Sequence, residues 1–337
     1  MYAHRGSEPR IPASNEKLLT SMAALAAFGP SHRFPTVAAS TGPMRGGVVR
    51  GDLWLVGSGD PELTGARLVT LATALRNAGL REVRGSVIGD TATFDRGWWA
   101  RGWQRNLSRF YVTRPTALAF DGNAVPKPER AAAASLTASL RADGVTVTGE
   151  PGAHPAPGDL RTIAAVRSAP LGSILARQNH GSINFDAEML TKALGFRAGR
   201  GASTAEGAAA IQAWVQRHGV RAHVFDGSGL SHRDRVSADG MVSLLLRAAH
   251  APWGGVLERS LPTGGEGTLA GRLVGVPVRA KTGTLFVTPV SALSGYVRSA
   301  DGAEVAFSVL SRDMDPSTAV ALEDAIVRLL ASSRLRA

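Results

Sequence analysis

The sequence has 337 residues and no cysteine. This absence excludes disulfide bonds, thiolate metal sites and a cysteine nucleophile. Long apolar runs are also absent: the longest, MAALAAF at residues 22–28, is far shorter than the ~20 residues that cross a bilayer. Residues 1–13 lack the apolar segment of a secretory signal. The chain is therefore not predicted to span a membrane.

Lysine is nearly absent as well. The chain has 38 basic residues, of which only four are lysines: Lys17, Lys127, Lys192 and Lys281. The composition thus favours arginine wherever a plain positive charge suffices. Lysine can lose its proton at accessible pH, whereas the guanidinium group of arginine effectively cannot. Each retained lysine is therefore a candidate for a role that arginine does not fill.

The net charge of +11 at pH 7 raises the question of nucleic-acid binding. The arginines are scattered along the chain without a dense block, so nucleic acid is not a predicted partner. Attraction to an anionic surface or polymer is the more general consequence of such a charge. The eight histidines show no ligand spacing such as H-E-x-x-H, and no metal site is predicted.

One segment, RGWWARGWQRNLSRFY at residues 96–111, combines aromatic and basic side chains. Two interpretations are open. The segment can stack sugars, anionic wall polymer or bases, or its aromatic side chains can form the core of a flap or insert. The residues concerned are Trp98, Trp99, Trp103, Arg101, Arg105 and Arg109.

Apolar periodicity, with glycine and proline as stops, divides the chain into helices and strands. The predicted helices are 14–28, 64–78, 128–142, 170–178, 184–195, 204–218, 237–250 and 315–334. The predicted strands are 33–40, 47–56, 81–90, 144–149, 276–286, 291–299 and 303–312, and an Asp-Gly pair predicts a hairpin between the last two. Residues 150–159 are predicted to be a linker or surface loop.

Helices before and after an antiparallel meander predict an α/β sandwich, in which an antiparallel sheet is flanked by helices. We expect this domain to be discontinuous, formed by residues 1–40 and 160–337. The inserted domain, of the α+β class, is predicted to span residues 41–159.

The stretch SNEK, residues 14–17, begins the first predicted helix. Positions 14 and 17 lie on one face of a helix, close enough for the lysine amine to take the serine proton. A hydroxyl is a poor nucleophile until a neighbouring base accepts that proton. A helix N-terminus, partial burial and a second cation all lower the pKa of a lysine, and Lys281 is a candidate second cation. Ser14 and Lys17 are thus a candidate nucleophile and base, although Ser14 alone also suits a helix cap.

Two further stretches complete a pattern: SIN at residues 182–184, before a predicted helix, and KTG at 281–283, in a predicted strand. Taken singly, Ser182 also suits a helix cap and Lys281 a solvated strand position. In this order, however, S-x-x-K, S-x-N and K-T-G form the constellation shared by penicillin-binding proteins and class A β-lactamases.

The flanking residues make the resemblance more specific. Five segments resemble, in order, segments of the class C low-molecular-mass penicillin-binding proteins, the D-alanyl-D-alanine carboxypeptidase/endopeptidase family also called peptidase family S13. These segments are PASNEKLLT (12–20), GDLWLVGSGDPELT (51–64), SINFDAEML (182–190), DGSGLS (226–231) and RAKTGTL (279–285). The resemblance runs from about residue 2 to the C-terminus. It implies a transpeptidase-like fold and a serine-type D-Ala-D-Ala carboxypeptidase that acts on peptidoglycan stem peptides, is acylated by β-lactams and needs no metal or cofactor.

The resemblance also implies roles for individual residues. Ser14 would be the acylated nucleophile, Lys17 its general base, and Ser182 a proton relay to the leaving amine. The backbone N–H groups of Ser14 and Thr284 would form the oxyanion hole. The substrate-binding residues would be Asn184, Lys281, Thr282, Gly283 and Thr284. Lys281, Thr282 and Thr284 would receive the terminal carboxylate, and Gly283 would leave room for the substrate. The amide of Asn184 would hold the substrate backbone or help to position Lys17.

The chain departs from the family pattern at three points. Ile183 stands where the second motif usually has aspartate, and we expect this to tune activity without abolishing it. The insert is shorter than usual, which leaves substrate preference open. Only 13 residues precede Ser14, where family members have a signal peptide, a helix and a strand. Either the true start lies upstream or the sheet lacks a strand and the fold is compromised, and we expect the first.

The family's cell-envelope setting implies an extracytoplasmic location and anionic wall polymers as further candidate partners. Two other functions remain open on the sequence: a β-lactamase or esterase with the same apparatus, and a catalytically impaired wall-binding homologue.

Overall fold

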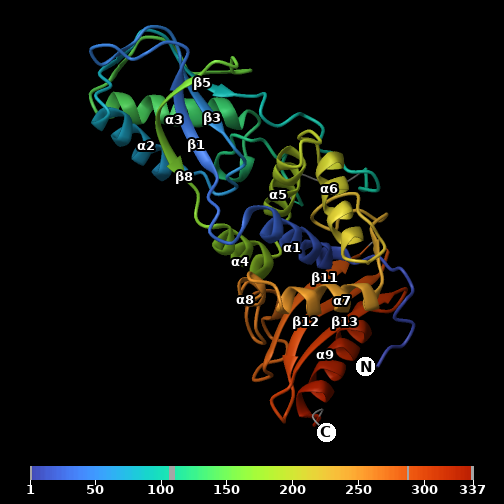
Figure 1. The fold of residues 1–337 in the computed structure, drawn as a ribbon. Helices are drawn as coiled ribbons and strands as arrows, with labels where there is room; N and C mark the ends of the chain where they lie inside the picture. Colours follow the sequence, from blue (N-terminus) through green and yellow to red (C-terminus); the bar gives the residue numbers. More distant parts are fainter. Residues whose placement is uncertain (1, 106–110, 287, 335–337) are drawn as a thin grey trace.

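The computed structural model describes residues 2–105, 111–286 and 288–334. Figure 1 shows two lobes. A main lobe holds both ends of the described chain, and an insert lobe extends from it, joined by two strands that run side by side.

The main lobe is built on a three-stranded antiparallel sheet in the order β11-β12-β13. These strands are β11 (Val278–Leu285), β12 (Val290–Arg298) and β13 (Glu304–Arg312). Side chains of a strand alternate between the two faces. In β12, accordingly, Ala292 and Tyr296 pack toward α7 (Ala238–Ala249), while Leu293 and Val297 pack toward α9 (Pro316–Ser332). The sheet is thus flanked by helices on both faces, as the sequence predicts.

Helix α1 (Glu16–Phe28) runs through the centre of the main lobe. Every residue from Glu16 to Leu25 is buried, because α1 is surrounded by the sheet and other helices. A single 3-10 turn, Ala13–Asn15, precedes α1 and contacts β11 and β12. The surrounding helices are α4 (Leu171–Gly181), α5 (Asn184–Arg197), α6 (Thr204–Arg217) and α8 (Gly254–Arg259). The start of α1 is therefore fixed between a sheet edge and a layer of helices.

The insert lobe has a five-stranded sheet in the order β7-β5-β3-β1-β8. Strand β1 pairs antiparallel with both neighbours, whereas β3, β5 and β7 run parallel to one another. Helices α2 (Gly65–Asn77) and α3 (Pro128–Ala142) cover the sheet and enclose a second apolar core. The strands are β1 (Pro35–Ser40), β3 (Leu53–Gly57), β5 (Val87–Asp90), β7 (Gly152–His154) and β8 (Arg161–Arg167).

Short elements complete the fold. The described residues also form a small parallel sheet of three two-residue strands, an antiparallel pair of two-residue strands and two further 3-10 turns. They are β2 (Val48–Val49), β4 (Glu82–Val83), β6 (Thr146–Val147), β9 (Ala222–His223), β10 (Arg235–Val236), η2 (Asp121–Asn123) and η3 (Gly267–Leu269). No helix in the described part of the chain combines the length and apolar character needed to cross a bilayer.

The predicted fold class, an α/β sandwich with an inserted α+β domain, is confirmed. The bounds of the insert differ. Strands β1 and β8, which the expected boundaries assign to the main domain, pair with each other and with β3 inside the insert sheet. We therefore propose insert boundaries near residues 34 and 168. The predicted linker 150–159 also contains strand β7, which pairs with β5.

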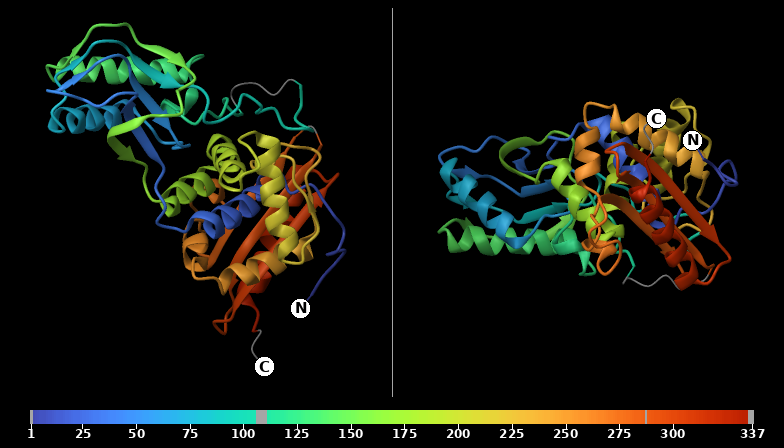
Figure 2. Two further views of the ribbon diagram at one scale, coloured as in Figure 1. Left: turned by 45° about the horizontal axis from the view of Figure 1, so that its top comes forward. Right: turned by 90° about the horizontal axis from the view of Figure 1, so that it is seen from below.

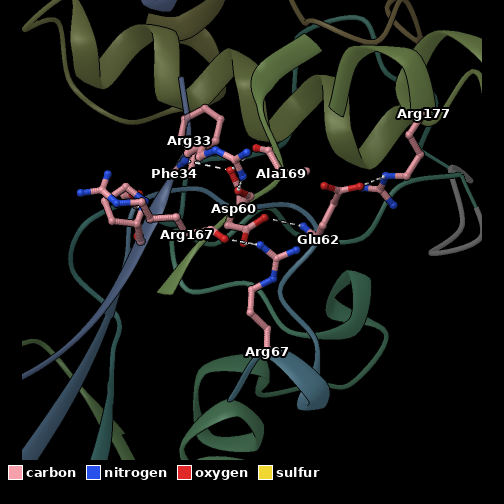
Figure 3. Close-up of polar contacts among 11 residues, drawn as sticks. Arg33, Phe34, Asp60, Glu62, Arg67, Arg167, Ala169 and Arg177 are labelled. Carbon is pink, nitrogen blue, oxygen red and sulfur yellow. Dashed lines mark hydrogen bonds and ion pairs between the residues drawn. The ribbon is translucent and has the colours of Figure 1, made fainter. Parts of the chain in front are cut away.

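Hydrogen bonds close the insert sheet where β1 and β8 leave the main lobe. Ser168 donates its N–H to the Phe34 carbonyl at 2.9 Å, and its hydroxyl accepts from the Phe34 N–H at 2.9 Å. The Arg33 guanidinium donates to the Ser168 carbonyl at 2.8 Å. Figure 3 shows Arg33 and Phe34 at this junction, beside charged residues of the insert. The two strands are therefore tied together at the point where the lobes meet.

Candidate active site

Ser14 lies in the 3-10 turn directly before α1. Its side chain is half-buried, while the neighbouring Ala13 and Asn15 are buried. Ala13 has φ +47°. This left-handed conformation is unfavourable for any residue that carries a side chain. This strained turn presents Ser14 beside the start of α1, as expected of a residue at the head of the first helix.

Lys17 lies one turn further on, and its fully buried amine has three partners. Nζ is 3.0 Å from Ser14 Oγ, 2.7 Å from Asn184 Oδ1 and 2.7 Å from the Ser228 carbonyl oxygen. Two of these partners can only accept hydrogen bonds. A neutral amine has two N–H groups and one lone pair, so its N–H groups bond to Asn184 and Ser228 and its lone pair faces the Ser14 hydroxyl. The arrangement is that of a base aimed at a nucleophile.

The pKa of Lys17 suits this role. Burial lowers the pKa of its amine from 10.5 to about 8. Asp226 and Glu188 oppose the fall, because their negative charges favour the ammonium form. A substantial fraction of Lys17 is therefore unprotonated in mildly alkaline solution.

The second motif joins α4 to α5. Ser182 has φ +51°, a left-handed residue that turns the chain, and Asn184 is the first residue of α5. Lys281 Nζ donates to Ser182 Oγ at 3.0 Å and to the Thr282 carbonyl at 2.8 Å. Ile183 is partly buried and packs against the main core. The structure thus forms two hydrogen-bonded groups, Ser14–Lys17–Asn184 and Ser182–Lys281, which lie close enough for the charge of Lys17 to act on Lys281.

The two lysines differ from expectation in one respect. The sequence suggests a Lys281 cation that lowers the pKa of Lys17. In the structure, burial lowers the pKa of Lys281 well below its ordinary value, and the charge of Lys17 lowers it further. Among the described residues, carboxylates raise the pKa of Lys17 but none raises that of Lys281. Without a bound anion, burial and the charge of Lys17 both favour the neutral form of Lys281.

Strand β11 forms the outer edge of the sheet beside the nucleophile. The Ala280 N–H points away from β12, since it donates to the Pro262 carbonyl at 3.1 Å. Backbone groups alternate along a strand, so the N–H groups of Thr282 and Thr284 point to the same open edge. The Thr282 hydroxyl donates to the Thr268 hydroxyl at 2.8 Å, and Thr284 is exposed.

Gly283 lacks a side chain for a reason other than the one expected from the sequence. A Cβ atom built on Gly283 would lie 2.8 Å from the Pro12 carbonyl oxygen and 2.9 Å from the Ser14 nitrogen. The space that it leaves is therefore taken by the backbone of Pro12 and Ser14. This close approach places the Ser14 N–H next to the open edge of β11.

The sequence did not predict the two buried carboxylates near Lys17. Asp226 and Glu188 are fully buried and hold the loop that carries the Ser228 carbonyl. Glu188 accepts from the N–H groups of Gly227 and Ser228 at 3.0 and 2.9 Å. The motifs DGSGLS and SINFDAEML contain these carboxylates, but only as family matches. Acidic residues within apolar helical and loop segments are the signal that could have identified them.

Lysine scarcity also identifies a residue that the sequence reasoning left without a role. Lys192 is fully buried, like Lys17 and Lys281, and only Lys127 is exposed. Lys192 Nζ donates to the Asp95 carbonyl at 2.6 Å and approaches the Asp95 carboxylate at 3.4 Å. It thereby ties the insert to α5, the helix that begins with Asn184.

A charged contact ties the GSGDPEL segment to the second motif. Asp60 accepts from the Glu62 N–H at 2.9 Å, and Glu62 pairs with Arg177 of α4 at 3.0 Å, as Figure 3 shows. Arg177 also pairs with the buried Asp186 of α5 at 2.6 Å. The Arg177–Asp186 pair joins the two helices on either side of the turn that contains Ser182. Glu62 of the insert therefore contacts the ion pair that holds this turn.

The tryptophans of the Trp/Arg-rich segment pack against one another, as the second interpretation predicts. Trp98, Trp99 and Trp103 contact one another edge to face, with ring centroids 5.4–5.8 Å apart. Trp103 is buried, whereas Trp99 keeps 48% of its surface exposed. Arg109 lies outside the described residues. In the part of the chain that the structure describes, no group of three or more histidine or carboxylate residues is arranged to hold a metal ion.

The chain matches one protein family over nearly its whole length. The family described as "D-Ala-D-Ala carboxypeptidase 3 (S13) family" matches residues 1–128 and 121–333. A D-alanyl-D-alanine carboxypeptidase of Actinomadura sp. (strain R39) is 31% identical over 426 aligned positions, which cover 98% of this chain and 78% of the relative. The D-alanyl-D-alanine carboxypeptidase DacB of Haemophilus influenzae is 26% identical, over 90% of this chain and 81% of the relative.

The fold has a solved counterpart. The crystal structure of penicillin binding protein 4 from Haemophilus influenzae superimposes with a TM-score of 0.84 and 24% identity, over 99% of this chain and 94% of that chain. The 426 aligned positions of the Actinomadura relative exceed the 337 residues of this chain. That relative therefore contains segments that this chain lacks.

Proposed function

The chain belongs to the D-Ala-D-Ala carboxypeptidase 3 (S13) family of serine peptidases, and we propose that it cleaves D-Ala-D-Ala termini of peptidoglycan stem peptides with Ser14 as nucleophile. One observation carries the assignment of roles. The Lys17 amine has acceptors for both of its N–H groups, so its lone pair is directed at Ser14 Oγ, 3.0 Å away. A general base must lie within this reach of the proton that it removes.

The reaction proceeds by acylation and hydrolysis. Lys17 takes the Ser14 proton as Oγ attacks the carbonyl carbon of the penultimate D-Ala. The oxyanion that forms is held by the N–H groups of Ser14 and Thr284. The close approach of Gly283 to the Ser14 nitrogen supports this assignment. The C–N bond then breaks, D-Ala leaves with a proton delivered through Ser182, and water hydrolyses the acyl-Ser14 ester.

The terminal carboxylate of the substrate binds at the edge of β11. Lys281, Thr282 and Thr284 supply an amine, two hydroxyls and outward-facing N–H groups there. The bound carboxylate provides the anion that Lys281 lacks in the free protein, and so favours its ammonium form. That ammonium, 3.0 Å from Ser182 Oγ, supplies the proton that Ser182 passes to the leaving amine.

β-Lactams acylate Ser14 by the same attack, because their amide carbonyl and carboxylate occupy the positions of the D-Ala-D-Ala terminus. The test is covalent labelling with a fluorescent penicillin. Wild-type protein is expected to be labelled and Ser14→Ala to remain unlabelled, with equal folding of the two checked by circular dichroism. Equal labelling of the variant would remove Ser14 as nucleophile. Steady turnover of the penicillin would indicate a β-lactamase, and absence of any adduct a non-catalytic wall-binding protein.

We also propose that the protein acts outside the cytoplasmic membrane, where peptidoglycan is found, and that anionic wall polymers attract it. The net charge of +11 supports the second proposal. Such attraction is electrostatic and weakens with salt. Adsorption to isolated walls is therefore expected to fall as sodium chloride is raised from 50 to 500 mM, and salt-independent adsorption would contradict it.

A further inference from the structure

The base function of Lys17 depends on the two groups that accept its N–H bonds. These are the Asn184 Oδ1 atom and the Ser228 carbonyl, each 2.7 Å from Nζ. If either acceptor moved, an N–H group would turn toward Ser14 and the lone pair would turn away. What holds these two acceptors therefore decides whether Lys17 can act as a base.

Both acceptors are held by one segment of the insert, which we call the strap and define as residues 94–105 and 111–112. Figure 2 (left) shows this segment leaving the insert lobe and passing beside α5 and α6. Asn184 uses its other amide atom, Nδ2, to donate to the Tyr111 carbonyl at 2.8 Å. The strap thereby fixes the amide so that Oδ1 faces Lys17.

The second acceptor is held through Asp226. This buried carboxylate accepts from the N–H groups of Gly229 and Ser231, at 2.7 and 2.8 Å, and so folds the loop that carries Ser228. A further donor belongs to the strap: Trp103 Nε1 donates to Asp226 Oδ2 at 2.6 Å, a shorter distance than either of these two bonds. Hydrogen bonds to a charged acceptor are the stronger kind.

Two further hydrogen bonds and an apolar contact join the strap to the loop that carries Ser228. Ser231 Oγ donates to the Arg101 carbonyl at 2.8 Å, and the His232 N–H donates to the Gly102 carbonyl at 3.2 Å. Trp103 packs with Leu230 of the loop in a small apolar cluster. The members of this cluster are Ala100, Trp103, Val112 and Leu230, with Trp98 packed against them. The cluster also links Trp103 to the residue beside Tyr111, so the two fixed points move together.

We propose that the strap is a positioning element for the catalytic base, with Trp103 holding Ser228 through Asp226 and Tyr111 holding Asn184. This inference rests on the proposed role of Lys17. It gives the insert a part in catalysis: without the strap, both acceptors of the Lys17 amine lose a partner that fixes them. Trp103 is a positioning residue, since it touches neither Lys17 nor Ser14.

The test compares two neighbouring tryptophans. Trp103→Phe keeps an aromatic ring and removes the indole N–H, while Trp98→Phe makes the same change in a half-buried neighbour. Among the described residues, the indole N–H of Trp98 has no hydrogen-bond partner. For both variants, the acylation rate constant at saturating penicillin and the dissociation constant of the non-covalent complex are measured separately by stopped-flow fluorescence.

We expect Trp103→Phe to lower the acylation rate constant by about 10- to 100-fold, the range set by one hydrogen bond to a charged group. The dissociation constant is expected to stay within about twofold, and Trp98→Phe to match the wild type in both. A folded Trp103→Phe protein with the wild-type acylation rate would overturn the inference. So would an equal loss in Trp98→Phe, which would mean a packing effect only.

A second variant covers the case in which Trp103→Phe does not fold. Asp226→Asn leaves the strap side chains in place but puts an amide nitrogen among N–H donors, and it is expected to show the same selective loss of acylation rate. Wild-type acylation by folded Asp226→Asn would also overturn the inference. Failure of the underlying function is distinguishable, because wild-type protein would then form no acyl adduct at all.

Discussion

The Lys281 amine donates to the Ser182 hydroxyl at 3.0 Å, which repeats across the site the 3.0 Å contact between the Lys17 amine and the Ser14 hydroxyl. The site thus contains two serine–lysine pairs. They differ in their surroundings, since carboxylates lie near Lys17 and raise its pKa, while Lys281 has the charge of Lys17 as its main electrostatic neighbour. The roles that we propose follow from position instead: Lys17, in contact with Ser14, accepts the proton, and Lys281, in contact with Ser182 and charged when the substrate carboxylate binds, donates it.

Removing the second amine is expected to slow acylation. Lys281→Met keeps the length of the side chain but gives Ser182 no proton source and the substrate carboxylate no cation. General acid catalysis contributes about 10²- to 10⁴-fold to a rate, so we expect a loss in this range in the second-order rate of penicillin acylation. A loss of less than threefold would show that Lys281 has no part in the reaction.

Arginine at position 17 is expected to stop acylation while leaving a positive charge. Lys17→Arg carries a guanidinium that does not give up its proton at accessible pH, so the base is lost and the rate falls by at least about 10²-fold. The matched control is Lys127→Arg, because Lys127 is exposed and forms none of the hydrogen bonds of the site. Labelling by fluorescent penicillin measures both, and an active Lys17→Arg protein would exclude Lys17 as base.

Adding one methyl group at Gly283 is expected to displace the nucleophile. The new Cβ would lie within 2.9 Å of the Pro12 and Ser14 backbones, closer than carbon atoms pack. We expect Gly283→Ala to lower the melting temperature and to reduce acylation at least tenfold. Gly158→Ala is the control, since its Cβ would meet no atom within 4 Å. Wild-type acylation by Gly283→Ala would show that the edge of β11 is further from Ser14 than described.

The ion pair beneath the second motif predicts a pH-dependent stability change. Burial raises the pKa of Asp186 from 3.8 to about 7, and Arg177 limits the rise. Arg177→Ala therefore raises this pKa further. A raised carboxyl pKa in the folded state costs stability as pH rises toward that pKa. The loss of unfolding free energy in Arg177→Ala is thus expected to be larger at pH 9 than at pH 6, by about 1 kcal/mol or more per pKa unit of added shift.

Urea unfolding of wild type and Arg177→Ala at the two pH values measures this difference. An equal loss at pH 6 and pH 9 would mean that Asp186 does not titrate in this range. Glu62→Ala makes the opposite change, because the charge of Glu62 raises the pKa of Asp186. Its removal is expected to lower that pKa and therefore to cost less unfolding free energy at pH 9 than at pH 6.

Local sequence signals were sufficient for much of the fold. Helix α3 has the predicted bounds of 128–142, because alanine-rich periodicity ends at an Asp-Gly turn. The meander β11–β13 was likewise visible in its alternation and hairpin turn. Local signals could not assign β1 and β8 to the insert sheet, since strand pairing between Pro35–Ser40 and Arg161–Arg167 is a long-range property.

In the site, too, contacts between residues close in the sequence could be predicted and long-range contacts could not. Ser14 and Lys17 are three positions apart, and helical spacing alone predicts their contact. Trp103 and Asp226 are 123 positions apart, and nothing in either segment indicates the 2.6 Å bond between them. The causes of the two lysine pKa shifts were also beyond the sequence, because they depend on how deeply the fold buries each amine and which carboxylates lie beside it.

The most direct test of the account is a titration of the Lys17 amine in the folded protein. Because the chain has only four lysines, labelling their ε-carbons with ¹³C gives few NMR signals, and loss of one signal in Lys17→Arg assigns Lys17. The account predicts that this signal titrates with a midpoint at about 8, and that the acylation rate rises with pH along the same curve, since only the free amine accepts the Ser14 proton. A Lys17 amine that stays cationic to about pH 10 while acylation proceeds at full rate would contradict it.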